Sequence, residues 1–249
     1  MQDQIAIVTG GSGGIGRAIA TRLAAEGAKV CITYLRNEHR AEEFVRQLSS
    51  APGDVIAVRA DTGREEDVAA LFQTVDRKLG RLTALVNNAG VLGAEGRIDQ
   101  VQPGPLAELW ATNITGYFLC AREAVRRMSP RHGGRGGAIV NISSMAGVRG
   151  GGEDRVAYGA SKGAVNAFTL GLGKELALEG IRVNAVVPGH VDTEIHDAPG
   201  GRERLQRATQ LVPMKRAGRP EEVAEAVVLL LSTKASFVTS TLLQVAGGA

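Results

Sequence analysis

The stretch Ile5-Ala6-Ile7-Val8-Thr9-Gly10-Gly11-Ser12-Gly13-Gly14-Ile15-Gly16 sets the architecture of this chain. Its apolar start predicts a buried strand over residues 5–9, and a helix is expected over residues 14–26. Glycines let a backbone approach a ligand closely, and the free N–H groups of a helix N-terminus favour a phosphate. The loop lacks the Gly-Lys-Ser/Thr sequence of nucleoside triphosphatases. We therefore predict a loop that binds the pyrophosphate of a dinucleotide, with a merely flexible turn as the alternative.

Short apolar runs alternate with longer helical patterns along the whole chain. The runs are continuously apolar, as expected of strands buried on both faces of a parallel sheet. The expected strands are residues 5–9, 29–34, 55–59, 84–87, 138–143, 183–187 and 242–245. The expected helices are residues 14–26, 38–50, 65–79, 107–128, 157–179 and 220–233.

This alternation is compatible with two α/β architectures. A (β/α)8 barrel has eight strands where we expect about seven, and a glycine loop after the first strand is typical of the doubly wound sheet. We predict an α/β fold with a single doubly wound Rossmann domain over residues 1–249. Its parallel strands are expected to be flanked by helices on both faces, with a substrate lid near residues 190–215.

The composition is that of a folded protein with surplus glycine. Glycine accounts for 33 of 249 residues, about 13% against a usual ~7%. Glycine and proline together stay below the share typical of disordered chains, and the collagen repeat is missing from the sequence. The net charge of +3 is too small to favour nucleic acid or an anionic membrane as a partner.

The sequence carries no signal of export. Its first residues lack the basic start and apolar stretch of a signal peptide, and no run of about 18 apolar residues occurs. Cys31 and Cys120 lack CxxC or Cys/His spacing, which favours reduced, buried thiols over a disulfide or a zinc site. We expect a cytoplasmic protein without a metal site.

Six motifs follow one another along the chain. The first is TGxxxGxG, with glycines at positions 10, 14 and 16. The others are Asn87-Asn88-Ala89-Gly90, Asn113, Ser143-Ser144, Tyr158-Gly159-Ala160-Ser161-Lys162 and Pro188-Gly189. Together they resemble the short-chain dehydrogenase/reductase family, in particular its glucose-1-dehydrogenase-like and 3-oxoacyl-acyl-carrier-protein-reductase-like members. The resemblance implies an NAD(P)-dependent oxidoreductase that interconverts a secondary alcohol and a ketone by hydride transfer.

The spacing of Tyr158 and Lys162 suits this chemistry. Residues four apart share one face of a helix, so both side chains can reach one site. A tyrosine with an ordinary pKa of ~10 is a poor base at neutral pH, and a neighbouring ammonium favours its phenolate. By itself YxxxK is common on helix surfaces. The glycine loop and Asn-Asn-Ala-Gly elsewhere in the chain favour the catalytic interpretation.

The resemblance implies roles for four residues. Tyr158 is expected to act as the acid/base, and Lys162 to lower its pKa and to bind the nicotinamide ribose. Ser144 is expected to polarise the substrate oxygen, and Asn113 to support a proton relay through a water. Thirteen residues, 145–157, separate Ser144 from Tyr158, one more than the family pattern. The extra residue leaves Ser143 as the alternative to Ser144.

The end of the second expected strand bears on the choice of nicotinamide. An acidic residue there accepts a bond from the 2′-hydroxyl of NAD, whereas a basic residue meets the 2′-phosphate of NADP. The segment from Ile32 to Asn37 contains no carboxylate, and the first one after it is Glu38. The guanidinium of Arg36 can bind a phosphate. Gly13 argues the other way, because NADP-preferring relatives often carry Arg or Lys there, and Arg36 can equally be a solvated helix-start residue. We expect NADP, with NAD as the alternative.

The resemblance also implies which residues hold the cofactor. Asn87, Ala89 and Gly90 are expected to line its riboses, and Asp61 to contact the adenine. The complete expected set is Gly10, Ser12, Gly14, Ile15, Gly16, Arg36, Asp61, Thr62, Asn87, Ala89, Gly90, Tyr158, Lys162, Pro188, Gly189, Val191 and Thr193.

Two other functions remain as alternatives. One is a non-enzymatic dinucleotide-binding regulatory protein, although such proteins tend to lose the tyrosine or the lysine. The other is an isomerase or dehydratase on the same fold. The small-molecule alcohol or carbonyl substrate is not readable from the sequence. His190 and His196 are expected to be ordinary loop residues, with contact to a polar substrate as the alternative. The role of the glycine-rich loop at 147–152 is open.

Assembly is expected from the resemblance alone, as a homodimer or homotetramer formed through two long helices. Glycines weaken helices, so those of the catalytic helix predict close contacts on its faces. They are Gly159, Gly163, Gly171 and Gly173.

Overall fold

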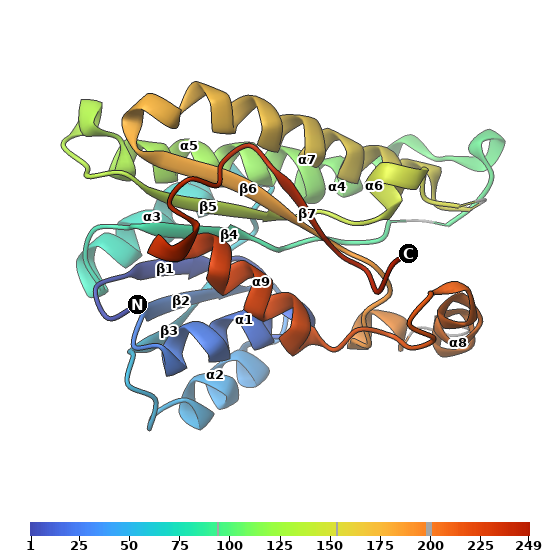
Figure 1. The fold of residues 1–249 in the computed structure, drawn as a ribbon, viewed down its shortest axis with the longest axis horizontal. Coiled ribbons are helices and arrows are strands. Elements are labelled where there is room, and N and C mark those ends of the chain that lie inside the picture. The colour runs from blue at the N-terminus through green and yellow to red at the C-terminus, as the bar shows by residue number, and fades with distance from the viewer. Residues whose placement is uncertain (94, 153, 198–200) are drawn as a thin grey trace.

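The structure is a computed structural model that describes residues 1–93, 95–152, 154–197 and 201–249. The described residues form one sheet of seven parallel strands in the order β3-β2-β1-β4-β5-β6-β7 (Figure 1). The strands are β1 (Ile5–Val8), β2 (Lys29–Tyr34), β3 (Val55–Arg59), β4 (Ala84–Asn87), β5 (Gly137–Ile142), β6 (Ile181–Pro188) and β7 (Leu242–Val245). The strand order reverses between β1 and β4, and open α/β sheets bind ligands beyond the carboxyl ends of the strands at such a point.

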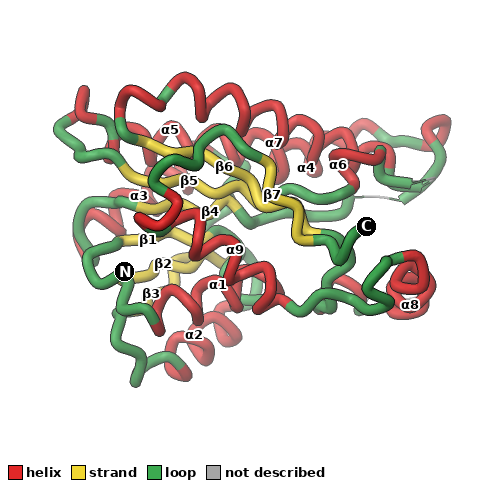
Figure 2. The backbone as a smooth tube through the Cα atoms, viewed as in Figure 1, coloured by secondary structure: helices red, strands yellow, loops and turns green. Residues whose placement is uncertain are grey.

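Helices cover both faces of the sheet, as the tube in Figure 2 shows. One layer holds α1 (Gly14–Ala25), α2 (Glu38–Gln47) and α9 (Pro220–Leu231), and the other holds α3 (Glu65–Lys78), α5 (Gly116–Met128) and α7 (Val156–Glu175). Three further α-helices lie in the described chain: α4 (Pro103–Trp110), α6 (Ala146–Arg149) and α8 (Gly201–Leu211). Together with the seven parallel strands, the two layers confirm the predicted single doubly wound Rossmann domain.

The continuous apolar character of the strands follows from burial on both faces. Successive side chains of a strand point to opposite faces of the sheet. In β1, Ala6 and Val8 pack into the core under α1 and α9, whereas Ile7 packs under α3 and α5. All three are fully buried, so a polar residue at any of these three positions would cost core packing.

The predicted helix over residues 107–128 was wrong in its start and its continuity. It begins at Pro103, because proline is favoured in the first turn of a helix, where its missing N–H is not needed. A π-helical turn, η2 (Ala111–Thr115), then separates α4 from α5. Such turns insert one extra residue into a helix and are frequent at functional sites.

The segment near residues 190–215 contains a 3-10 turn, η5 (Glu194–His196), and the helix α8. Figure 1 shows α8 standing apart from the two main helical layers. Residues 198–200 of the predicted lid lie outside the described residues. Within the described ranges, no helix combines the length and the apolar character needed to cross a lipid bilayer.

Candidate active site

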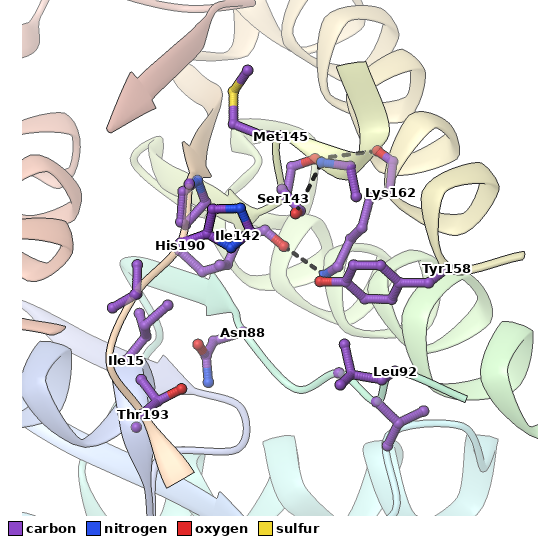
Figure 3. Close-up of a pocket in the computed structure, with 18 of the residues that line it drawn as sticks. Ile15, Asn88, Leu92, Ile142, Ser143, Met145, Tyr158, Lys162, His190 and Thr193 are labelled. Atoms are coloured by element: carbon purple, nitrogen blue, oxygen red, sulfur yellow. Dashed lines mark hydrogen bonds between the residues drawn. The ribbon is translucent and has the colours of Figure 1, made fainter. Parts of the chain in front are cut away.

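A cleft of about 650 Å³ opens beyond the carboxyl ends of β1, β4, β5 and β6 (Figure 3). Its walls come from the segments that follow these strands: Gly10 with residues 12–15, residues 88–92, residues 142–146 and residues 188–191. Figure 3 shows Tyr158 and Lys162 reaching into this space from α7. The cleft therefore combines the glycine loop with the predicted catalytic residues of the helix.

The glycine loop has a backbone that few other residues could adopt. Gly10 and Gly14 have φ values of +63° and +49°, in the left-handed region. A Cβ on Gly16 would lie 2.5 Å from the carbonyl oxygen of Gly10. No side chain caps the N-terminus of α1, and the Gly14 N–H donates to a carboxylate oxygen of Glu194 at 3.0 Å. The loop thus leaves room for an anion and already holds one from the chain itself, so its residues fit a dinucleotide pyrophosphate.

Asn88 ties the glycine loop to the end of β4. Its side-chain amide donates to the carbonyl oxygens of Thr9 at 2.8 Å and Gly10 at 3.2 Å. The Thr9 hydroxyl oxygen in turn accepts from the backbone N–H groups of Asn88 and Ala89, both at 2.9 Å. Asn88 lines the cleft and was not among the predicted site residues, although its place in the Asn-Asn-Ala-Gly motif was a signal.

Asn87 is placed differently from the prediction. Its side chain is buried and donates to Asn141 Oδ1 at 3.0 Å, beneath the cleft rather than along its lining. Its neighbours Ala89 and Gly90 do line the cleft. The motif therefore combines one structural amide below the cleft, that of Asn87, with three residues that line it, Asn88, Ala89 and Gly90.

Lys162 is the buried cation of the site. It is 3% exposed, and its ammonium donates to the Ile142 carbonyl at 2.8 Å and to the Tyr117 hydroxyl at 3.2 Å. The Lys162 Nζ lies 6.0 Å from the centre of the Tyr158 ring. Burial lowers the pKa of Lys162 from its usual 10.5 to about 7. The low value follows from desolvation, because the contacts of this amine are neutral oxygens.

Tyr158 is half-buried beside Lys162. Burial raises the pKa of Tyr158, while its hydrogen bond with Ser144 and the charge of Arg155 lower it. Burial is the largest of these effects, so the phenol keeps its proton at neutral pH. A protonated phenol is the form that can donate a proton to a carbonyl oxygen.

The two adjacent serines have different surroundings. The Ser143 hydroxyl donates to Asn166 Oδ1 at 2.6 Å and to the Lys162 carbonyl at 3.1 Å, which fixes it between β5 and α7. The Ser144 hydroxyl contacts Tyr158 and accepts the backbone N–H of Ala146 at 3.1 Å. Both serines line the cleft, but only Ser144 has its hydroxyl directed at the tyrosine.

Asn113 lies in the π-helical turn η2 and is fully buried. Its amide donates to the Val91 carbonyl at 2.9 Å and to Ser161 Oγ at 3.1 Å, and its Oδ1 accepts the Val91 N–H at 2.9 Å. A methyl group placed on Gly90 would lie 3.4 Å from Asn113 Oδ1 and 3.5 Å from Lys162 Nζ. Asn113 and Lys162 thus flank the same small space above Gly90.

The remaining predicted cofactor residues fall into two groups. Gly10, Ser12, Gly14, Ile15, Pro188, Gly189, Val191 and Thr193 line the cleft. Among the described residues, the lining does not include Gly16, Arg36, Asp61 or Thr62. Arg36 is exposed, and the Asp61 carboxylate accepts the Gly63 N–H at 2.9 Å within its own loop. Roles for these residues at the cofactor stay predictions.

The glycine-rich loop before α7 accommodates the extra residue between Ser144 and Tyr158. Gly150, Gly151 and Gly152 have φ values of +98°, +72° and +79°, so three consecutive residues lie in the left-handed region. Gly151 and Gly152 line the cleft next to Tyr158. The insertion therefore shapes the wall of the cleft and leaves the tyrosine at the site.

Several polar and basic side chains also line the cleft. His190 and His196 both line the cleft; His190 is exposed and His196 is half-buried. Burial lowers the pKa of both imidazoles, which keeps them neutral at pH 7. Arg149 and Arg155 line the cleft too, and Arg155 donates to Glu95 at 2.9 Å. Loop histidines carry no sequence signal that separates a cleft position from a solvated one.

A dinucleotide-type Rossmann cleft with a tyrosine and a lysine at its floor defines a class of nicotinamide-dependent oxidoreductases. The family model described as enoyl-(acyl carrier protein) reductase matches residues 10–249. The chain is 47% identical over 244 residues to the uncharacterized oxidoreductase YgfF of Escherichia coli strain K12, covering 98% of this chain and 99% of that protein. It is 38% identical to the glucose and ribitol dehydrogenase homolog of Oryza sativa subsp. japonica, covering 100% of this chain and 86% of the relative.

A solved structure agrees with these sequence relatives. A short-chain dehydrogenase/reductase of Serratia marcescens, 35% identical, superposes with a TM-score of 0.92 over 99% of this chain and 98% of that one. The chain belongs to the short-chain dehydrogenase/reductase family, the NAD(P)-dependent oxidoreductases predicted from its motifs.

Proposed function

We propose that this protein interconverts a small secondary alcohol and the corresponding ketone. The observation that carries the proposal is the convergence of Tyr158, Lys162 and Ser144 in one cleft beside the glycine loop. The nicotinamide of NAD(P), when bound, supplies or accepts the hydride. The chain itself must then orient the substrate oxygen and move one proton to or from it.

Each residue of this group has a distinct role in the proposal. Tyr158 transfers the proton, and the Lys162 ammonium favours its phenolate and binds the nicotinamide ribose. The Ser144 hydroxyl donates to the substrate oxygen, where negative charge develops during reduction. Asn113 supports a proton relay to Lys162 through a water, because both groups flank the space above Gly90. The cofactor is held by the expected set of residues given above.

Ser144→Ala is expected to lower kcat by about 10²–10³-fold, because the substrate oxygen loses a donor at the position where charge develops. The fold should be little affected, since the Ser144 side chain bonds to the partly buried backbone N–H of Ala146 and to Tyr158, which both lie at the edge of the cleft. Steady-state kinetics and urea unfolding check both statements.

Ser143→Ala is the matched control. It removes the buried hydroxyl that donates to Asn166 Oδ1, so about 1–3 kcal/mol of stability should be lost. A larger loss of kcat in Ser143→Ala than in Ser144→Ala would reassign the substrate-polarising role to Ser143.

We propose NADP as the physiological cofactor. No carboxylate follows β2 before Glu38, and the Glu38 carboxylate accepts the Tyr34 hydroxyl at 2.7 Å. One oxygen of that carboxylate is already engaged, and no carboxylate stands at the end of β2 itself, where an acidic residue would favour NAD. Steady-state assays with NADPH and NADH in parallel, over ketones, sugars and acyl thioesters, test the preference and the substrate class together.

The segment near residues 190–215 is proposed to cover the substrate. His190, Glu194 and His196 from this segment line the cleft, and α8 follows directly in the chain. The neutral imidazoles and the guanidinium of Arg149 suit a polar substrate with oxygen acceptors. We also propose a cytoplasmic location, because Cys31 and Cys120 are free thiols that are fully buried.

The protein is proposed to assemble as a homodimer or homotetramer through the face of α4, α5 and α7. Trp110, Phe118 and Val156 expose 44%, 52% and 51% of their surface on these helices. The Phe118 and Phe168 rings stack at 4.1 Å between centres. Of the four glycines of α7, Gly171 meets nothing within 4 Å of its missing Cβ, which leaves room for a second chain.

Phe118→Arg is expected to reduce the mass in solution to that of the monomer or lower oligomer, because a buried unpaired guanidinium disfavours the interface. Light scattering measures this directly. Phe237→Arg, a fully exposed position beside β7, serves as the control and should leave at least a dimer. A monomeric wild-type chain would contradict the proposed assembly.

A further inference from the structure

Arg40 stands at the edge of the cofactor cleft, in the first turn of α2. Its backbone is fixed, because the Asn37 side chain caps α2 by accepting the Arg40 N–H at 3.0 Å. Its guanidinium extends away from the helix toward the glycine loop, where Gly13 and Glu194 both line the cleft. A cation near a helix N-terminus is disfavoured by the helix dipole, so this position calls for an anion nearby.

The absence of a side chain at position 13 makes room for this guanidinium. A Cβ built on Gly13 would lie 2.9 Å from Arg40 Nη2 and 3.2 Å from Arg40 Cζ. Any larger residue at 13 would therefore push Arg40 out of its place. Gly13 and Arg40 therefore form one unit: the glycine leaves the space, and Arg40 of α2 fills it with the positive charge that the glycine loop itself lacks.

The Glu194 carboxylate is the anion that meets this unit. One of its oxygens pairs with Arg40 Nη2, and the other accepts the Gly14 N–H at 3.0 Å. The two side chains are 35% and 48% exposed, so solvent screens the pair and makes it easy to exchange. A phosphate offers the same kind of oxygens with more charge, and it matches the guanidinium fork in two parallel hydrogen bonds.

Arg40 is better placed than Arg36 to release the Glu194 carboxylate and bind a phosphate in its place. Arg36 is exposed and does not line the cleft. Among the described residues, its side chain makes no hydrogen bond to a residue that lines the cleft. Arg40 touches two lining residues and lies on the β2–α2 side of the cleft, where the adenosine ribose of a dinucleotide is held in this class of fold.

We propose that Arg40 is the residue that selects NADP, by exchanging the Glu194 carboxylate for the 2′-phosphate of the adenosine ribose. This rests on the proposed use of NADP. Glu194 belongs to η5 in the proposed lid, so the same exchange releases the lid from the glycine loop when the dinucleotide enters.

Binding measurements without turnover test the assignment. Titration calorimetry with NADP, NAD, adenosine 2′,5′-bisphosphate and AMP compares wild type with Arg40→Gln, Arg36→Gln and Glu194→Gln. Arg40→Gln should weaken NADP and the bisphosphate by about 10- to 100-fold and NAD and AMP by less than about threefold. Glu194→Gln should tighten NADP by a few-fold, because the guanidinium loses its competing partner. Arg46→Gln, an exposed position at the far end of α2, controls for the loss of one positive charge.

The proposal is overturned if Arg40→Gln weakens NADP and NAD equally, or if only Arg36→Gln loses the preference. It is also overturned if Glu194→Gln weakens NADP. All of these outcomes leave the proposed oxidoreductase intact, because that proposal needs only that the wild type binds a nicotinamide dinucleotide and reduces a carbonyl. A wild type that binds neither dinucleotide would overturn both.

Discussion

Tyr158→Phe is expected to lower kcat by about 10²–10⁴-fold while the affinity for NADPH stays within about twofold of wild type. The change removes one oxygen and leaves the ring, so the cleft keeps its shape. What is lost is the hydroxyl that contacts Ser144, on a ring whose centre lies 6.0 Å from Lys162 Nζ. Steady-state kinetics with a reducible ketone and fluorescence titration with NADPH measure the two effects separately.

A control for this variant comes from a second tyrosine in the same region. The Tyr117 hydroxyl donates to the Ile142 carbonyl at 2.9 Å and accepts from Lys162, but it is buried below the cleft lining. Tyr117→Phe should affect stability more than turnover, because it removes buried hydrogen bonds and no group at the reacting oxygen. If Tyr158→Phe kept wild-type turnover, the proton would come from elsewhere and the assignment would be lost.

Lys162→Met is expected to reduce kcat by a similar factor, and in contrast to Tyr158→Phe it should also weaken NADPH binding. The methionine keeps much of the side-chain volume and loses the ammonium proposed to bind the ribose and to favour the phenolate. Kinetics and calorimetry on the same preparation give the two readouts. Retained NADPH affinity would remove the ribose-binding role, and retained turnover would remove the role toward Tyr158.

The same variant makes the pH dependence of stability measurable. The folded-state pKa of Lys162 is lowered from 10.5 to about 7, so between these values the unfolded chain binds a proton that the folded chain does not. Stability of wild type relative to Lys162→Met should therefore rise with pH above about 7, by at most ~1.4 kcal/mol per pH unit, and level off below it. Urea unfolding at pH 7, 8 and 9 measures the difference. A difference independent of pH would show that the Lys162 amine stays charged in the fold.

The sequence predicted the sheet better than the helices around it. Parallel strands read as short apolar runs, so the ends of each run mark the ends of the strand, as in the buried strand β2 and the partly exposed edge strand β3. The π-helical turn at Asn113 escaped prediction, because inserting one residue into a helix leaves the apolar pattern on both sides almost unchanged. The helix α8 was not predicted either, because Leu205 is the one buried residue among its described side chains and its apolar face is small.

The sequence predicted those parts of the site that come from short motifs. It did not predict the contacts between residues far apart in the chain. Tyr158 and Lys162 stand four residues apart on one helix, so their convergence follows from spacing alone. The contact of Arg40 with Glu194 joins residues that lie 154 positions apart in the chain, so no local sequence pattern could predict it. The same holds for His190 and His196, whose place in the cleft depends on how the segment after β6 folds back.

The most direct test of the proposed reaction follows the hydride itself. The purified protein is incubated with NADPH deuterated at the transferring C4 position and a panel of ketones, sugars and acyl thioesters, and the products are analysed by mass spectrometry. The account predicts a secondary alcohol carrying one deuterium on its carbinol carbon, formed by wild type and lost in Tyr158→Phe. Tight NADPH binding with no deuterium in any product, or product formed without deuterium, would contradict it and favour a binding protein or an isomerase.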